Sequence, residues 1–306
     1  MGRSIPRDTI LEDTDIVIPI MGATGAGKST FINRLLGKDL LEVGHKLSSC
    51  TVNLRPVIYE HRLNTPSLRG RRGIIVDTPG LDDTYVGDVE ILTRIAGWLE
   101  RSYRKQMVLG VLYLHDVSQD RFSGTARRNL EMFNHLCGDA ALDKVILAIT
   151  KGGRLAPDNV KRREEELKSV HWKSMIDKRS VVRQFFGTTK SAQDIINIFL
   201  ERASRRQREQ IMKLHIQIQA ELVDNRKFIP QTEAGKQLRY TLQEVLALQK
   251  QMISLESDLA QGGDPEAEAK LREAEEKMRK MEDQVKALKV SLSNRIGRKL
   301  KKLLGI

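Results

Sequence analysis

The chain has 306 residues, of which 40% are hydrophobic and 30% are charged, and its formal net charge is +12. This length and composition fit a globular protein of about two domains and exclude a chain that is disordered throughout. Aromatic residues make up only 5%, which argues against the base-stacking surfaces that single-stranded nucleic-acid binders use. No nucleic-acid-binding module is recognisable, so nucleic acid is not the expected partner despite the positive charge.

The two cysteines, Cys50 and Cys137, are too few for a disulfide framework and indicate a reducing compartment. The sequence contains no apolar run of about 18 residues, which a transmembrane helix would need. Its first residues also lack the apolar stretch of a secretory signal. We therefore expect a cytoplasmic protein.

Residues 1–200 alternate short, apolar, β-branched runs with helical patterns. Such alternation predicts βαβ units and a parallel sheet, and continuous apolar runs are typical of strands buried on both faces. The predicted fold class is therefore α/β, with a mostly parallel central sheet flanked by helices. The expected strands are residues 15–20, 73–76, 107–114, 145–150 and 181–186.

The segment GATGAGKS matches the P-loop pattern G-x-x-x-x-G-K-[ST] at every fixed position. In such a loop the glycines let backbone N–H groups curl around phosphates, the lysine reaches the β and γ phosphates, and the serine hydroxyl binds Mg²⁺. An apolar strand precedes the motif and a helical pattern follows it, so the helix dipole also favours an anion here. The predicted phosphate-binding residues are Gly22, Ala23, Thr24, Gly25, Ala26, Gly27, Lys28, Ser29 and Thr30.

Two further elements complete the predicted phosphate site. The strand at 73–76 runs into Asp77–Gly80 (DTPG); an acid at this position binds Mg²⁺, usually through water, and the N–H of Gly80 senses the γ-phosphate. Between the motifs, Thr51 is the candidate for a second hydroxyl ligand, with an ordinary strand-edge threonine as the alternative. The predicted Mg²⁺ ligands are Ser29, Thr51 and Asp77, and the predicted catalytic residues are Lys28, Thr51 and Gly80. A P-loop by itself fits an ATPase or a kinase equally well.

The series GATGAGKSTFIN, SCT and DTPGLDDT resembles the septin-like branch of P-loop GTPases. That branch includes septins, the immunity-associated nucleotide-binding GTPases and the chloroplast outer-envelope import receptors. The stretches YLHDVSQDRFSGTARRNLEMFNHLCGD and SAQDII are similar to uncharacterised G-domain-containing proteins described from fungi. The resemblance covers roughly residues 13–200. It implies a G domain that binds GTP or GDP with Mg²⁺, Thr51 and Asp77–Gly80 as its two switch motifs, and nucleotide-dependent association through the G domain, often near membranes.

The residues that would read the base depart from this family in one position. Its members usually carry [NT]-K-x-D, whose carboxylate accepts hydrogen bonds from N1 and N2 of guanine. Here Thr150 and Lys151 are in place, but Gly153 stands where the aspartate is expected. Losing a charged acceptor costs about 1.5–3 kcal/mol of binding free energy, or about 10- to 100-fold in discrimination. Lys151 remains able to stack on the base, and Ser191 and Ala192 resemble the last base-contacting loop.

Hydrolysis by the isolated chain is expected to be slow. Leu81 follows Gly80 where a Ras-like enzyme carries the glutamine that orients water, and no arginine finger is recognisable. A group supplied in trans would raise the rate about 10³-fold or more. We expect a GTP-binding protein whose nucleotide state controls self-association or partner binding. The alternatives are a nucleotide-binding scaffold with negligible hydrolysis and an ATP-binding P-loop protein.

After residue 200 the sequence becomes helical, with apolar residues at spacings of three and four. Pro230 should interrupt this pattern, and a glycine-rich break separates a helical extension, 201–261, from a last segment, 262–306. From Leu271 to Leu292 that segment keeps about three heptads with dense flanking charge, which predicts a coiled coil. A lone amphipathic helix docked on the globular domain is the alternative. A coiled coil would add a second route to a homo-oligomer.

The last acidic residue is Asp283, and the residues after it combine an apolar face with positive charge. Basic amphipathic helices lie on anionic membrane surfaces, so peripheral membrane attachment is one prediction. The other is that the apolar face extends the coiled coil. The apolar residues are Ile296, Leu300 and Leu303, and the basic ones are Arg295, Arg298, Lys299, Lys301 and Lys302.

Overall fold

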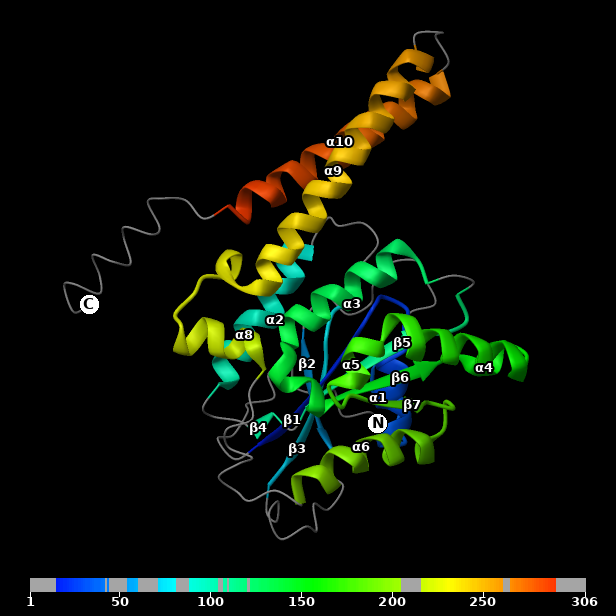
Figure 1. Ribbon diagram of the computed structural model, residues 1–306, viewed down its shortest axis with the longest axis vertical. Coiled ribbons are helices and arrows are strands. Elements are labelled where there is room, and N and C mark those ends of the chain that lie inside the picture. Colours follow the sequence, from blue (N-terminus) through cyan, green and yellow to red (C-terminus); the bar gives the residue numbers. More distant parts are fainter. Residues whose placement is uncertain are drawn as a thin grey trace, which may run out of the picture.

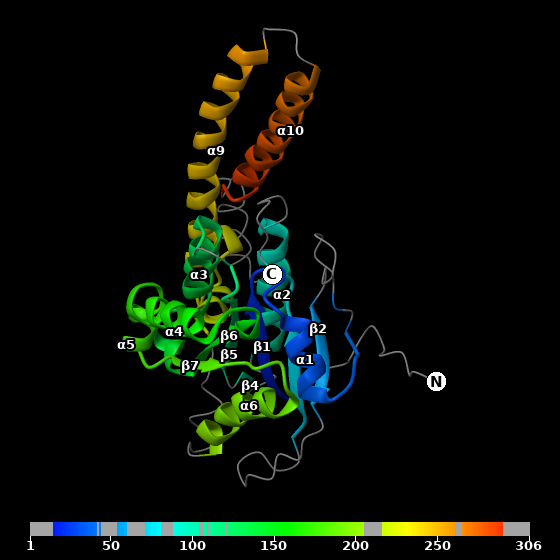
Figure 2. The same ribbon diagram turned by 90° about the vertical axis from the view of Figure 1, so that its right-hand side faces the viewer.

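A computed structural model of the chain shows a sheet covered by helices, from which a helical hairpin projects (Figures 1 and 2). The structure describes residues 15–41, 43, 54–59, 71–80, 88–103, 107–108, 110–119, 122–204, 216–260 and 265–289. Thr51, Leu81 and the basic stretch after residue 289 lie outside these ranges.

Seven strands of the described residues form one sheet, in the order β2-β3-β1-β5-β6-β7 with β4 also paired to β1. Only the β2–β3 pair is antiparallel, so the expected mostly parallel sheet is confirmed. The register pairs Ile20 with Asp77 and Asp116 with Thr150, which brings the carboxyl ends of β1, β3, β5 and β6 to one edge. The strands are β1 (Ile16–Gly22), β2 (Arg55–Tyr59), β3 (Gly73–Asp77), β4 (Met107–Val108), β5 (Val111–Asp116), β6 (Val145–Thr150) and β7 (Val181–Gln184).

Helices cover both faces of the sheet, because successive strand residues point to opposite sides. Ile18 and Ile20 of β1 pack in one core with α1 and α6, whereas Val17 and Met21 pack in another with α2, α3 and the tail helices. The helices are α1 (Lys28–Leu36), α2 (Asp88–Ser102), α3 (Gly124–Cys137), α4 (Pro157–Glu166), α5 (Lys173–Asp177), α6 (Thr189–Ser204), α8 (Gln217–Gln219), α9 (Glu233–Ala260) and α10 (Pro265–Ala287).

Apart from shifts of one or two residues at strand ends, such as β7 ending at Gln184 and not at 186, the strands differ from the sequence prediction in two places. The run expected at 107–114 is split into β4 and β5 beside Gly110, where an added Cβ would lie 2.1 Å from the Lys144 carbonyl oxygen. Strand β2 was not predicted at all. It pairs antiparallel with β3 at the sheet edge and contains Pro56, and proline in a sheet is largely confined to such edge positions.

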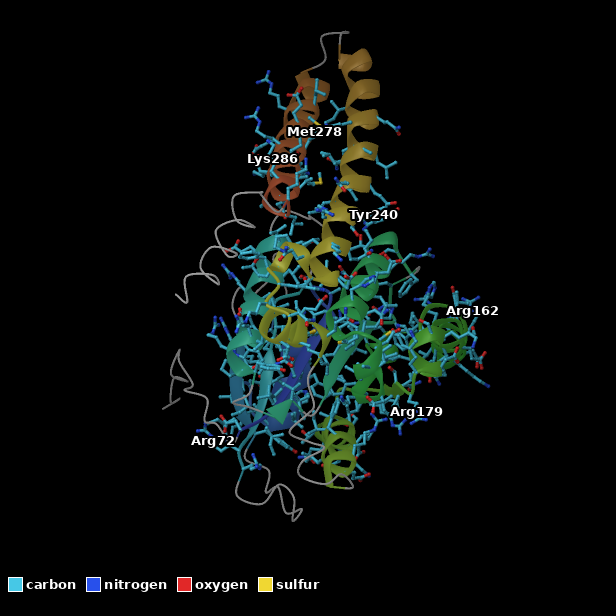
Figure 3. The ribbon with its side chains drawn as sticks, turned by 60° about the vertical axis from the view of Figure 1, so that its left-hand side comes forward. Arg72, Arg162, Arg179, Tyr240, Met278 and Lys286 are labelled. Carbon is cyan, nitrogen blue, oxygen red and sulfur yellow. The ribbon has the colours of Figure 1, made fainter. Side chains whose placement is uncertain are left out.

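The tail folds back on itself as a hairpin of α9 and α10, which pack along one another (Figure 2). Lys250 of α9 forms an ion pair with Glu282 of α10 at 2.9 Å. Figure 3 shows Met278 on the side of α10 that faces α9 and Lys286 on the outer side. The predicted interruption at Pro230 is confirmed, because a short 3₁₀ turn, Ile229–Gln231, separates α8 and the turn after it from α9.

The lower end of this hairpin docks on the globular domain. Met281, Val285 and Leu288 are buried in the same core as α2 and α3, and the backbone N–H of Val89 donates to Gln284 at 3.4 Å. The apolar stripe of α10 is therefore satisfied at least in part within the chain, and a coiled coil between chains stays a prediction. None of the helices described here combines the length and apolarity needed to cross a bilayer.

Candidate nucleotide-binding site

The loop between β1 and α1 has the backbone conformation that a phosphate-binding loop needs. Gly25 and Gly27 have φ values of 78° and 94°, in the left-handed region that favours glycine. Gly22 cannot carry a side chain, because a Cβ there would lie 2.4 Å from the Leu114 carbonyl oxygen. The loop thus curls tightly over the ends of β1 and β5, with the amino end of α1 facing its centre.

Lys28, the first residue of α1, folds back over this loop. Its ammonium group donates to the carbonyl oxygens of Gly22 at 3.0 Å and Ala23 at 2.9 Å, and the residue is only 7% exposed. The cation therefore sits at the centre of the loop rather than in solvent. Thr24 adds a buried hydroxyl that has no hydrogen-bond partner in the described part of the chain.

Ser29 and Asp77 meet at the carboxyl ends of β1 and β3. The Ser29 hydroxyl donates to Asp77 Oδ2 at 3.1 Å, and Asp77 is fully buried. A hydroxyl and a carboxylate placed together are the hard oxygen donors that Mg²⁺ prefers, so this pair fits the ion. Groups of three or more His, Cys, Asp or Glu residues able to hold a metal are absent from the described residues.

The DTPG turn lies directly against the phosphate loop. The Thr78 hydroxyl donates to the Ile20 carbonyl oxygen at 2.8 Å and ties the turn to β1. An added Cβ at Gly80 would lie 2.5 Å from the Thr24 nitrogen, so the two loops are in close contact. The structure thus brings Gly80 to the predicted phosphate site. The third predicted Mg²⁺ ligand, Thr51, lies outside the described residues.

Thr150, at the end of β6, holds the phosphate loop to the loop predicted to bind the base. Its buried hydroxyl lies 2.8 Å from the Ala26 carbonyl oxygen and 3.1 Å from that of His115. A hydroxyl has one hydrogen, so these contacts share a single donor. The sequence marked Thr150 as a base-loop residue, but gave no sign that it also anchors Ala26.

The side chain of Lys151 is held by Asp116, the last residue of β5. Lys151 adopts φ 59° and its ammonium group pairs with Asp116 Oδ2 at 2.7 Å. Burial alone would raise the pKa of Asp116, but hydrogen bonds from Lys151 and Ser118 outweigh burial and lower it. The carboxylate is therefore charged near neutral pH and holds the Lys151 stem in place at the mouth of the site.

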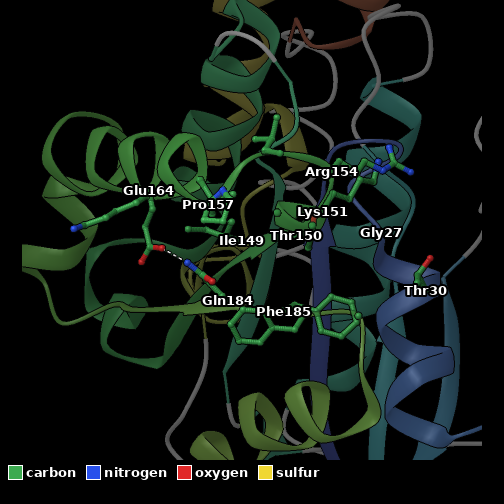
Figure 4. Close-up of a pocket in the computed structure, with 17 residues that line it drawn as sticks. Gly27, Thr30, Ile149, Thr150, Lys151, Arg154, Pro157, Glu164, Gln184 and Phe185 are labelled. Atoms are coloured by element: carbon green, nitrogen blue, oxygen red, sulfur yellow. Dashed lines mark hydrogen bonds between the residues drawn. The ribbon is translucent and has the colours of Figure 1, made fainter.

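A cavity of about 630 Å³ extends from the phosphate loop along the loop after β6 toward α4 (Figure 4). Gly27 and Thr30 line it at the phosphate end, and Lys151 and Gly153 line it beside the loop. Phe186 also lines it and is 73% exposed, which is unusual for an aromatic side chain. This volume is in the range of small-molecule binding pockets.

The loop after β7 lines one end of the cavity, and its conformation is held by Ser191, which the sequence placed in the last base-contacting loop. The Ser191 hydroxyl accepts hydrogen bonds from the backbone N–H groups of Phe186 at 3.2 Å and Thr188 at 3.3 Å. Ala192 is buried beneath it. Ser191 and Ala192 therefore position the loop, whereas Phe186 and Gly187 face the cavity.

Sequence reasoning missed the groups that α4 and β7 contribute to the cavity, chiefly Glu164 and Gln184. Gln184 donates a hydrogen bond to Glu164, drawn as a dashed line in Figure 4. Helix α4 has no buried residue among its ten, so in the sequence it resembles any charged surface helix. Glu164 is identified instead by its place in the cavity lining and by its hydrogen bond from Gln184 of β7.

The chain is similar to several solved structures and to one protein family. Among solved structures, Toc33 from Arabidopsis thaliana in complex with GDP and Mg²⁺ is similar, with 15% identity and a TM-score of 0.50 over 64% of this chain and 86% of that one. Era from Aquifex aeolicus bound to GDP and AlF₄⁻ has 20% identity and a TM-score of 0.44 over 61% of this chain and 56% of its own.

At these identities the Toc33 likeness establishes the G-domain fold alone. A comparison with curated proteins returned no match. The family comparison is more direct, because the AIG1 family model matches residues 16–221, from the first strand through α8 and into the turn after it. This chain belongs to the AIG1 family.

Proposed function

We propose that this chain is a GTP-binding protein that holds GTP or GDP with Mg²⁺, and that its nucleotide state controls self-association or partner binding. The observation that carries the proposal is the preformed phosphate site, in which Lys28, Ser29 and Asp77 converge on one glycine-curled loop. The Toc33 structure with the same fold was solved with GDP and Mg²⁺, which supports the choice of ligand.

Each predicted site residue has a role in this proposal. Lys28 would exchange its loop carbonyl partners for phosphate oxygens, and the backbone from Gly22 to Ser29 would surround them. Ser29, Asp77 and Thr51 would hold Mg²⁺, which supplies charge neutralisation on the phosphates. The N–H of Gly80 would report on the γ-phosphate, and Lys151 would cover one face of the base.

Slow hydrolysis remains part of the proposal. Leu81 follows Gly80 in the sequence, so water lacks the glutamine that orients it in Ras-like enzymes. A stabilising group from a second copy or a partner would accelerate the reaction. A dimerization-deficient mutant of Toc33 shares this fold at a TM-score of 0.50, so Toc33 itself dimerises. A scaffold without turnover and an ATP-binding protein remain the alternatives.

The tail offers a route from nucleotide state to association. Helix α2 begins eight residues after Gly80. In its first turn, the backbone N–H of Val89 donates a hydrogen bond to Gln284, which lies in the last turn of α10. A change at the γ-phosphate that moved the start of α2 would therefore act on the hairpin.

We also propose a cytoplasmic location, with peripheral membrane contact through the basic residues after 289. The resemblance to fungal G-domain proteins stays a prediction.

The test is a calorimetric titration of the full chain with GTP, GDP and ATP in the presence of Mg²⁺, combined with light scattering in each state. We expect GTP and GDP to bind more tightly than ATP, and the molar mass to differ between a GTP analogue and GDP. Equal affinity for ATP would contradict the guanine assignment. A molar mass that is the same in every nucleotide state would contradict control of self-association.

A further inference from the structure

Gly153 leaves an empty place in the cavity where the family pattern would put a carboxylate. An added Cβ at Gly153 meets no heavy atom within 4 Å, and its φ lies outside the strained left-handed region. No neighbouring side chain therefore occupies the position that a side chain at residue 153 would fill. A base bound in this cavity still needs a partner for its hydrogen-bonding edge, because a buried polar group left without one costs about 1–3 kcal/mol.

Among the described residues that line the cavity, Glu164 is the one carboxylate. It extends from α4 at the end of the cavity opposite Gly27 and Thr30, which adjoin the phosphate loop (Figure 4). Its side chain is 17% exposed and is held by two hydrogen-bond donors, Lys168 and Gln184. Lys168 and Gln184 each donate to one of its two oxygens, so the carboxylate is held in one orientation.

We propose that Glu164 reads the guanine base in place of the aspartate missing at position 153, an assignment that rests on the proposed GTP-binding function. A carboxylate has about four lone-pair positions, and Lys168 and Gln184 occupy two of them. The remaining two match the adjacent N1–H and N2–H donors of guanine. Adenine presents an acceptor at N1 beside its single amino group, so the same carboxylate disfavours it.

The rest of the cavity fits a planar base held in this orientation. Phe186 lines the same cavity as Lys151 and supplies an exposed aromatic side chain, and base–aromatic stacking contributes about 1–3 kcal/mol. The Ser191 hydroxyl fixes the backbone N–H groups of this loop. Stacking tolerates any base, so in this arrangement the choice of base falls to Glu164.

The test compares the affinities of wild type and Glu164→Gln for GTP, ITP, XTP and ATP, measured by competition against a fluorescent GTP analogue. Replacing an acceptor oxygen by an amide donor should weaken GTP binding about 10- to 100-fold. It should not weaken ATP binding, because the amide can donate to N1 of adenine. It should also raise the XTP-to-GTP affinity ratio, because xanthine carries a carbonyl where guanine carries its amino group. Glu165→Gln, the neighbouring exposed carboxylate, should keep every wild-type ratio.

Two further variants separate base reading from folding. Lys168→Gln removes the same ion pair but keeps the carboxylate, so it should retain the wild-type preference for GTP. Gly153→Asp in the Glu164→Gln background should restore it, since the position is open. Unchanged GTP, XTP and ATP ratios in Glu164→Gln, or an equal shift in Lys168→Gln, would overturn the assignment while leaving GTP binding intact. A wild-type chain that binds no nucleotide would instead refute the proposed function.

Discussion

Replacing Thr150 by valine tests whether the base loop and the phosphate loop act as one unit. The substitution keeps the β-branched shape but removes the hydroxyl that ties β6 to Ala26 and His115. Because Thr150 is only 1% exposed, water cannot readily replace the lost donor at the Ala26 carbonyl. Leaving a buried acceptor unsatisfied costs about 1–3 kcal/mol, so we expect the free energy of unfolding to fall by this amount.

The same change should weaken GTP binding, because it releases the carbonyl group that precedes Gly27 and Lys28. A loop that adopts its binding-competent form one-tenth of the time binds about tenfold more weakly. Urea unfolding gives the stability, and calorimetry with GTP and Mg²⁺ gives the affinity. Thr232→Val is the matched control, since Thr232 is also buried and hydrogen-bonded to backbone but belongs to the tail. Equal GTP affinity in the two variants would refute the coupling.

Two other predictions follow from burial. Burial lowers the pKa of His115 to about 4; the charge of Asp116 opposes this shift and His171 adds to it. In the unfolded chain the pKa of this histidine is about 6.5. Its contribution to the free energy of unfolding is therefore complete above pH 6.5 and is lost as the pH falls toward 4. About 2 kcal/mol should disappear by pH 5, and His115→Gln should flatten the pH profile of urea midpoints; an unchanged profile would contradict the assignment. Leu288 is 1% exposed, so Leu288→Ala should lower the free energy of unfolding by about 2–4 kcal/mol. Leu248 is 60% exposed, so Leu248→Ala should have little effect. Equal effects of the two substitutions would mean that the hairpin is not docked on the globular domain.

The parts of the fold that could be predicted are those set by local pattern. Apolar, β-branched runs such as 145–150 become buried parallel strands, and that one has the predicted bounds. The split at Gly110 could not be predicted, because it depends on a close approach to Lys144, which is distant in sequence. Strand β2 escaped notice because Arg55 and Pro56 weaken its pattern, and it gains its partner only from β3.

The candidate site divides in the same way. The phosphate residues form one contiguous motif with a fixed spacing, so the sequence places Lys28 and Ser29 without reference to the fold. The base end is assembled from β6, α4 and β7, and the exposure of α4 gave no reason to single out Glu164. The tail shows a further limit, since an apolar stripe predicts burial but not whether its partner is α9, the globular domain or another chain.

Every role proposed for the site depends on the binding of nucleotide phosphates by Lys28 and its loop. Its most direct test is a calorimetric titration of GTP with Mg²⁺ into the full chain and into Lys28→Ala, with Lys190→Ala, an exposed lysine of α6, as the control. We predict one GTP per chain for the wild type and Lys190→Ala, and an affinity at least about 100-fold lower for Lys28→Ala. Wild-type affinity in a folded Lys28→Ala variant, or no binding by the wild type, would show that this loop does not bind nucleotide phosphates.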